Sequence, residues 1–202
     1  MMRITRADAA LAQELKVLIE ESTPYALSTP SLGTPTFHDF VKGLVLSTNI
    51  IQVVDRHIPN GHRADWGQLI DEVDGNILSR ECDIIIYSGK PYKFIQNKCM
   101  RYVLAVKTQT KVVIQVRSGI HSVSRDDRIY SRDLKRMVPQ LWYFAECCWA
   151  KTKKRADDIR RDLRGAGYKQ FFYLYRMDPD RPKRTIDYEQ FIRFVQLVKN
   201  IS

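Results

Sequence analysis

The sequence predicts an α/β protein in which a mixed central β-sheet is flanked by helices on both faces. Three observations lead to this prediction. The chain has 202 residues, which is enough for one substantial core. Short apolar runs rich in Val and Ile, too short for helices, gather in the middle of the chain. Segments with apolar residues at helical spacing lie on both sides of these runs.

The N-terminal part of the chain is expected to be helical with one interruption. Residues 7–21 carry apolar side chains at helical spacing, and so do residues 37–54. Between them, residues 22–36 contain three prolines and many Ser and Thr, which is typical of a connecting arm. We therefore divide the chain into an N-terminal helix with this Pro-, Ser- and Thr-rich arm (residues 1–36) and an α/β domain (residues 37–202).

Strands are predicted where short apolar runs are bounded by turn residues. The strongest run is Glu81–Tyr87, which is followed by the turn-forming sequence Ser88-Gly89-Lys90-Pro91. The other predicted strands are residues 68–73, 102–106, 112–116 and 171–175.

Helical spacing returns in the second half of the chain. It predicts a helix over residues 134–150, with Pro139 in an early turn or at a kink. A basic helix over residues 157–164 should end at the glycines that follow it. A final amphipathic helix is expected over residues 188–198.

The chain is strongly basic. It contains 33 Lys and Arg against 23 Asp and Glu, which gives a net charge of +10 and an isoelectric point near 9.5. Such an excess favours nucleic acid as a partner, through long-range steering and counterion release; a charge that only maintains solubility is the alternative. The densest cluster of cations is the predicted contact with the phosphate backbone, with a solvated helix face as the alternative. It consists of Lys151, Lys153, Lys154, Arg155, Arg160, Arg161 and Arg164.

The cysteines and the hydropathy pattern indicate the compartment. Cys82, Cys99, Cys147 and Cys148 form no CxxC pair and have no His at zinc-finger spacing, so we do not expect a zinc site. The sequence has no signal peptide and no apolar stretch long enough to cross a bilayer. We expect a cytoplasmic protein that makes no membrane contact.

Two of the predicted strands carry polar residues two positions apart, which places each pair on one face of the sheet. Glu81 and Asp83 form one pair, and Gln115 and Arg117 form the other. Charge at the end of a buried strand is costly unless it is paired or binds a metal. The pattern fits a metal-dependent phosphodiesterase, in which carboxylates hold the cation, and it equally fits a salt-bridged network without metal.

A first Asp followed by a strand that ends in Glu-x-Lys is the motif of the PD-(D/E)XK superfamily of restriction-endonuclease-like nucleases, and this sequence resembles it. It resembles in particular an uncharacterised bacterial family of such proteins. The resemblance covers roughly residues 37–150, with residues 88–100 poorly matched. The matching pieces are Lys42-Gly43, Gly75–Ser79, Asp83–Tyr87 and Val113–Ser118.

The resemblance implies a restriction-endonuclease-like fold, DNA rather than RNA as the partner, and a role in defence against foreign DNA. By position, Asp83 matches the metal-binding Asp of the motif, Gln115 its Glu and Arg117 its Lys. Together with Glu81 these are the candidate catalytic residues. The candidate ligands of Mg²⁺ or Mn²⁺ are Asp83, Glu81 and Gln115.

The departures from the motif leave the activity open. Gln115 offers an amide oxygen without charge, which weakens Mg²⁺ binding, and Arg117 keeps its proton near neutral pH, so it cannot act as a base. Glu81, on the same face as Asp83, is hypothesised to replace the carboxylate missing at position 115. One alternative is a metal-dependent DNA endonuclease. The other is a catalytically inactive nuclease-like protein that binds nucleic acid or forms a homodimer or larger complex.

Overall fold

The computed structural model describes residues 35–71, 81–96, 101–178 and 180–202, together with Arg6, Ala10, Gln13, Glu14, Lys16 and Val17. The side chains of residues 35–42, 96, 101 and 181–184 are not described. Most of the predicted helix at residues 7–21 and nearly all of the predicted arm therefore lie outside the described residues, as does the matching piece Gly75–Ser79.

Four α-helices have described bounds. They are α2 (Pro35–Asp55), α3 (Arg125–Leu134), α4 (Lys153–Ala166) and α5 (Tyr188–Lys199). Each of the last three begins at a side-chain cap that satisfies a free backbone N–H, and the caps are Ser124, Thr152 and Asp187.

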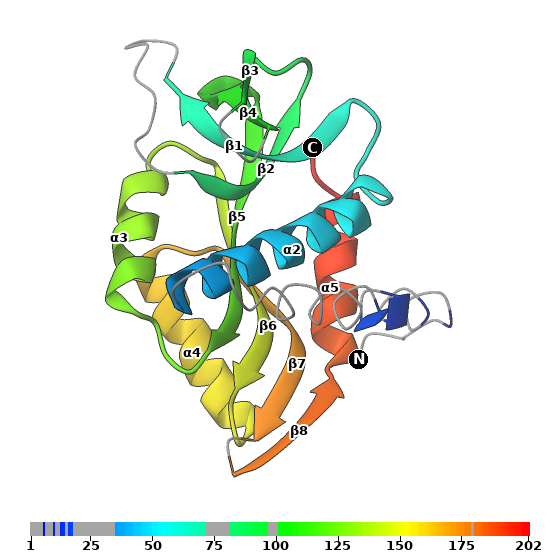
Figure 1. Ribbon diagram of the computed structural model, residues 1–202, viewed down its shortest axis with the longest axis vertical. Coiled ribbons are helices and arrows are strands. Elements are labelled where there is room, and N and C mark those ends of the chain that lie inside the picture. The colour runs from blue at the N-terminus through cyan, green and yellow to red at the C-terminus, as the bar shows by residue number, and fades with distance from the viewer. Residues whose placement is uncertain are drawn as a thin grey trace.

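The strands form one sheet, which runs the length of the molecule in Figure 1. They are β1 (His62–Ile70), β2 (Cys82–Ser88), β3 (Lys93–Gln96), β4 (Arg101–Val106), β5 (Thr110–Ile120), β6 (Gln140–Trp149), β7 (Gln170–Asp178) and β8 (Arg181–Ile186). Their order across the sheet is β3-β4-β1-β2-β5-β6-β7-β8. The pairs β1–β4, β5–β6 and β6–β7 are parallel and the other neighbours are antiparallel, so the sheet is mixed, as predicted.

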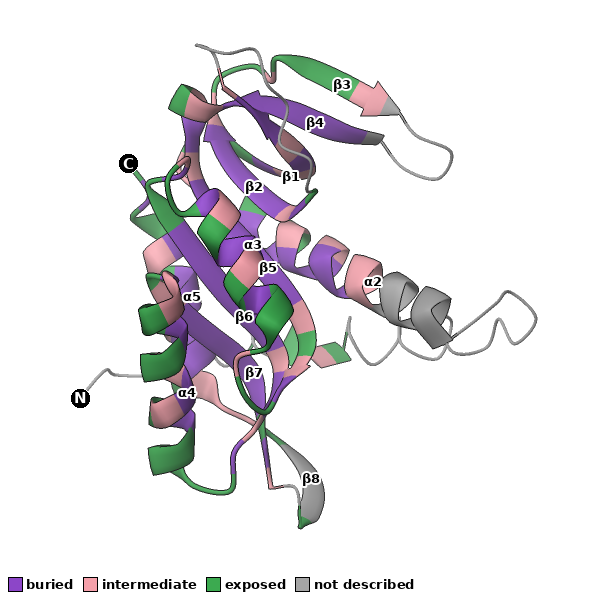
Figure 2. Cartoon of the chain, turned by 90° about the vertical axis from the view of Figure 1, so that its left-hand side faces the viewer, coloured by how far each residue is buried: buried purple, intermediate pink, exposed green. Residues whose placement is uncertain are grey.

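Helices cover both faces of the sheet. On one face, α2 and α5 pack on a core that includes Ile84 and Ile114; on the other, α3 and α4 pack on a core that includes Ile85 and Val113. Adjacent residues of one strand belong to different cores because successive side chains point to opposite faces. Figure 2 shows β5, β6 and β7 buried along most of their length, while the outward side of α4 is exposed. The predicted α/β fold class is confirmed.

The prediction of a helix over residues 134–150 is wrong. Helix α3 ends at Leu134, and most of the segment is the central strand β6. A strand covered on both faces is apolar at nearly every position, so its residues also satisfy a helical spacing. The run Leu141–Ala145 has this character, and all five of its side chains are buried.

Most other predicted elements are present with shifted ends. The strand predicted at residues 68–73 begins earlier, at His62, and the basic helix begins at Lys153 and ends before Gly167, which has a φ of 119°. The edge strands β3 and β8 were not predicted, because both are short: β3 has four residues, and three of the six residues of β8 are charged. Among the described residues, no helix is long and apolar enough to cross a membrane.

Candidate functional site

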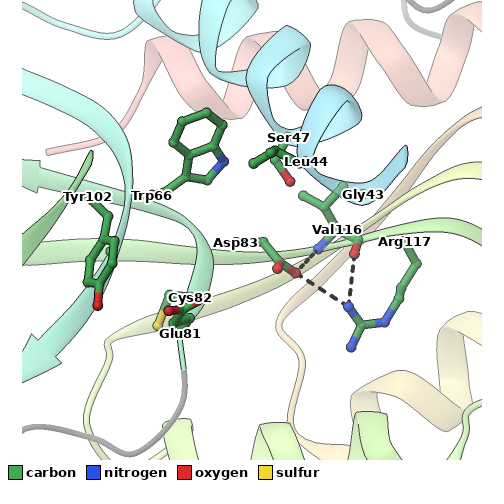
Figure 3. A pocket seen from close by; sticks show the side chains of 11 residues that line it. Gly43, Leu44, Ser47, Trp66, Glu81, Cys82, Asp83, Tyr102, Val116 and Arg117 are labelled. Carbon is green, nitrogen blue, oxygen red and sulfur yellow. Dashed lines mark hydrogen bonds and ion pairs between the residues drawn. The ribbon is translucent and has the colours of Figure 1, made fainter. Parts of the chain in front are cut away.

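A cavity of about 180 Å³ lies where β2 begins, between the sheet and the middle of α2. Residues of α2, β1, β2, β4 and β5 line it, and its charged wall consists of Glu81, Asp83 and Arg117 (Figure 3). Three of the four residues singled out from the sequence therefore meet in one cavity. The fourth, Gln115, does not line it.

The position of Asp83 follows from the way two strands separate. The pairing of β2 with β5 begins at Ile84 opposite Ile114, so Asp83 lies just outside the paired region. Its carboxylate accepts a hydrogen bond from the backbone N–H of Val116 at 2.8 Å. The side chain thus satisfies a backbone donor that a neighbouring strand leaves free, and this holds the carboxylate in the cavity.

Arg117 connects Asp83 with a second carboxylate that sequence reasoning missed. One of its terminal nitrogens, Nη1, lies 3.5 Å from Oδ2 of Asp83, and its Nε lies 3.7 Å from Oδ1 of Asp127 on α3. The Arg117 side chain is 40% exposed, whereas that of Asp127 is only 5% exposed. Arg117 therefore bridges an accessible carboxylate and a buried one.

The surroundings of Asp83 and Arg117 shift the pKa of both side chains. Burial raises the pKa of Asp83 above its ordinary value, and Glu81 adds to this effect, while Arg117 and the N–H of Val116 oppose it. For Arg117, burial works to lower the pKa, but Asp83 and Asp127 outweigh it and the pKa is raised. Arg117 therefore stays charged, and a role as a base is excluded on electrostatic grounds as well.

Gln115 points away from the cavity, into the core beneath α3. Its side chain is fully buried, and its Nε2 donates to Oδ1 of Asp127 at 2.9 Å. Its Oε1 accepts a hydrogen bond from the hydroxyl of Tyr168. Both ends of the amide are therefore occupied by protein partners, and its oxygen does not face the cavity.

Asp127 and Tyr168 complete this polar cluster. The Oδ2 of Asp127 accepts hydrogen bonds from the backbone N–H and the hydroxyl of Ser124. In return, the backbone N–H of Asp127 donates to the Ser124 hydroxyl. These reciprocal bonds form a capping box at the start of α3. The hydroxyl of Tyr168 lies 2.9 Å from the carbonyl oxygen of Asp127. The spacing Ser124-x-x-Asp127 was the only local signal for this position, and it indicates a helix start rather than a site.

The resemblance to nucleases implies a divalent metal, and the residues present fit it only in part. The described residues contain no group of three or more His, Cys, Asp and Glu side chains placed to hold a metal ion. However, Mg²⁺ is usually held by one or two carboxylates, with waters and substrate phosphates as its other ligands. Glu81 and Asp83 are two carboxylates that line the same cavity. The hydrogen bond and the ion pair that Asp83 makes with Val116 and Arg117 both use Oδ2.

The basic cluster lies around the start of α4 and along it, and several of its charges are already paired. Lys151 pairs with Asp180, Arg160 with Asp157, and Arg161 with Asp158. Arg155 lies within 3.5 Å of a loop carbonyl. The other three cations of the cluster are exposed and make neither an ion pair nor a side-chain hydrogen bond within the described part of the chain. They are Lys153, Lys154 and Arg164.

No protein-family model matches the sequence, and no curated protein matches it. Solved structures match over nearly the whole chain. NucC from E. coli MS115-1, in its cAAA-bound form, is similar with a TM-score of 0.60 at 13% identity, over 98% of this chain and 91% of that one. NucC from P. aeruginosa ATCC27853, also cAAA-bound, is similar with a TM-score of 0.61 at 11% identity, over 98% of this chain and 92% of that one.

These identities are low, so the likeness bears on the fold alone. The chain has the nuclease-type α/β fold of NucC, which confirms the restriction-endonuclease-like fold class predicted from the sequence. The likeness supports a nuclease-like fold in general and not the particular bacterial family that the sequence resembles.

Proposed function

We propose that this protein acts on DNA as a divalent-metal-dependent phosphodiesterase, with Glu81 and Asp83 as the metal-holding carboxylates. The observation that carries the proposal is that both carboxylates line one cavity beside Arg117, at the start of β2. The nuclease-type fold supports this choice of chemistry.

The balance of charge supports a divalent cation. Arg117 lies between Asp83 and Asp127, and its single positive charge offsets one of these two carboxylates. Glu81 adds another negative charge to the same cavity. Two units of negative charge are left over, and a divalent cation would neutralise them.

Each residue has a distinct part in the proposed reaction. Asp83, held through Oδ2 by Val116, presents Oδ1 to the cavity, and Glu81 replaces the carboxylate that the motif has at position 115. Mg²⁺ or Mn²⁺ bound there would supply an activated water and stabilise the charge that develops on phosphorus. Arg117 holds the phosphate by charge and by its planar donors, and it does not move a proton. Gln115 acts only within the core.

DNA is the proposed substrate, with defence against foreign DNA as the implied role. The net charge of +10 favours a polyanion, and the exposed cations of α4 offer contacts to phosphates. None of the α4 ion pairs involves the cavity residues, so we assign α4 to substrate binding rather than to chemistry.

A second candidate function is a catalytically inactive, nucleic-acid-binding or complex-forming subunit on a nuclease scaffold. The burial of Gln115 favours it, because the position that bears a metal ligand in the motif contributes none here. Arg117 would then pair with Asp83 permanently, and the cavity would bind a phosphate rather than cleave it.

One assay separates the two candidates. The purified protein is incubated with plasmid DNA, single-stranded DNA or RNA in Mg²⁺, Mn²⁺ or EDTA, with and without cAAA, since both solved NucC structures described above contain that ligand. We expect metal-dependent loss of DNA that is abolished in Asp83→Ala and strongly reduced in Glu81→Gln. Asp126→Asn, which removes an exposed charge from α3, is the matched control and should behave as the parent.

Two outcomes of this assay would contradict the proposed phosphodiesterase. If Glu81→Gln cleaves as fast as the parent, Glu81 is not a metal ligand. If DNA is bound under every condition and never cleaved, the second candidate function is correct.

A further inference from the structure

Asp127 has an unusual set of partners for a helix-capping residue. Its carboxylate is almost fully buried, and both oxygens accept hydrogen bonds, Oδ2 from Ser124 and Oδ1 from Gln115. Arg117 is the cation beside it. The buried carboxylate of Asp127 thus joins the start of α3 to two residues of β5, Gln115 and Arg117. These residues match the Glu and Lys positions of the nuclease motif.

The hydrogen bonds explain why position 115 carries an amide. A glutamate there would face the carboxylate of Asp127 across the distance of a hydrogen bond, in a core that excludes water. Two carboxylates in such contact cannot both be ionised without a large cost. Gln115 instead turns its NH₂ group toward Asp127 and its oxygen toward the hydroxyl of Tyr168. The neutral side chain at 115 is therefore required by the acid at 127.

We propose that Asp127 is the positioning residue of this site: its buried carboxylate on α3 lies behind the cavity and holds Arg117 in the cavity wall. Residues 115 and 127 then form an amide–acid pair whose members can be exchanged. The inference rests on the proposed site, but it does not require that the site cleaves DNA.

The exchange preserves the hydrogen bonds that residue 127 makes with residue 115 and with Ser124. In the double variant Gln115→Glu with Asp127→Asn, the new NH₂ group of residue 127 donates to the new carboxylate at 115, and its oxygen still accepts from Ser124. The carboxylate at 115 can accept from Tyr168 as before. In Gln115→Glu alone, two carboxylates that can only accept face each other. In Asp127→Asn alone, two NH₂ groups that can only donate face each other.

Thermal unfolding of the parent, the two single variants and the double variant tests the exchange. At pH 8, each single variant should unfold at least about 4 °C below the parent, and the double variant within about 2 °C of it. If a single variant does not fold but the double variant does, the proposal is supported. It is overturned if the losses of the two single variants add up in the double variant, or if the double variant does not fold.

The pH dependence distinguishes charge from packing. The titratable groups around position 115 are Asp127, Arg117, Asp83, Tyr130, Tyr143 and Tyr168; burial raises the pKa of the three tyrosines, so they stay neutral. In Gln115→Glu, one of the two facing carboxyls binds a proton more tightly in the folded state, so stability falls as the pH rises. The loss should therefore be larger at pH 8 than at pH 5, and an equal loss at both values would contradict the role of charge.

Titration with Mn²⁺ separates this inference from the proposed function. In Asp127→Asn, Arg117 is left with Asp83 alone, so Mn²⁺ should bind at least about three-fold more weakly, and the double variant should recover. Asp126→Asn should bind as the parent does. Unchanged Mn²⁺ binding in Asp127→Asn would show that Asp127 does not position Arg117. If the parent itself binds no Mn²⁺, the proposed function fails, and the thermal exchange decides the inference.

Discussion

The carboxylate of Asp83 accepts a hydrogen bond from the backbone N–H of Val116, 2.8 Å away on the neighbouring strand. The bond forms where β2 and β5 stop pairing, so an acidic side chain takes the place of a backbone acceptor. Oδ2 of Asp83 thus contacts Val116 and Arg117 in a cavity that Glu81 also lines. The opening between the two strands therefore creates the candidate site.

Removal of the charge of Asp83 should stabilise the protein at neutral pH. The pKa of this carboxyl is raised by burial, so the folded state binds its proton more tightly than the unfolded state does, and stability falls as the pH rises through the raised value. Asp83→Asn should raise the Tm at pH 7 by roughly 2–4 °C, with a smaller gain at about pH 4. Thermal melts of both proteins at the two pH values measure this. A lower Tm at pH 7 would show that pairing with Arg117 outweighs burial.

Two glycines that line the same cavity should respond in opposite ways to alanine. A Cβ at Gly67 would lie 2.3 Å from the carbonyl oxygen of Val103, and a Cβ at Gly43 would meet nothing within 4 Å. Gly67→Ala should destabilise the protein by about 1–3 kcal/mol through overpacking. Gly43→Ala, inside α2, should be neutral or stabilise by up to about 1 kcal/mol. Urea unfolding measures the change in the free energy of unfolding for both variants. Equal changes for Gly67→Ala and Gly43→Ala would contradict the close approach of β1 and β4.

Three cysteines should be unreactive in the folded protein. Cys82, Cys147 and Cys148 are buried thiols, and burial raises the pKa of Cys82 and of Cys148 to about 12. Only the thiolate reacts, so iodoacetamide at pH 8 should leave these three unmodified until the protein unfolds. Mass spectrometry of tryptic peptides, with and without denaturant, provides the measurement. Rapid native labelling of Cys82 would show that the start of β2 opens to solvent.

The exposed cations of α4 should contribute to DNA binding more than the paired ones. Each Lys or Arg that contacts a phosphate adds about one unit to the slope of log affinity against log salt concentration. Substitution of Lys153, Lys154 and Arg164 by alanine should therefore lower the slope by about two to three units. Arg161→Ala is the control, because Asp158 already pairs with that charge. Fluorescence anisotropy over a salt series tests this, and equal slopes for both variants would exclude α4 as the contact.

The elements and site residues that could be predicted from the sequence are those whose signals are local. The run Glu81–Tyr87 has the apolar character of a buried strand with turn residues after it, and β2 lies there. The spacing of Glu81 and Asp83 predicts that both lie on one face of the strand, and both line one cavity. These features depend on a few neighbouring residues, so the sequence is sufficient to predict them.

The partners of the polar residues were decided by tertiary structure. Gln115 reaches Asp127, 12 residues away, and Tyr168, 53 residues away, because α3 and the segment after α4 pack against the same face of the sheet. Likewise, β6 is a strand because helices cover both of its faces, which no local pattern expresses. Hydrogen bonds and burial depend on which elements pack together, and spacing along one strand cannot show whether a side chain faces the cavity or the core.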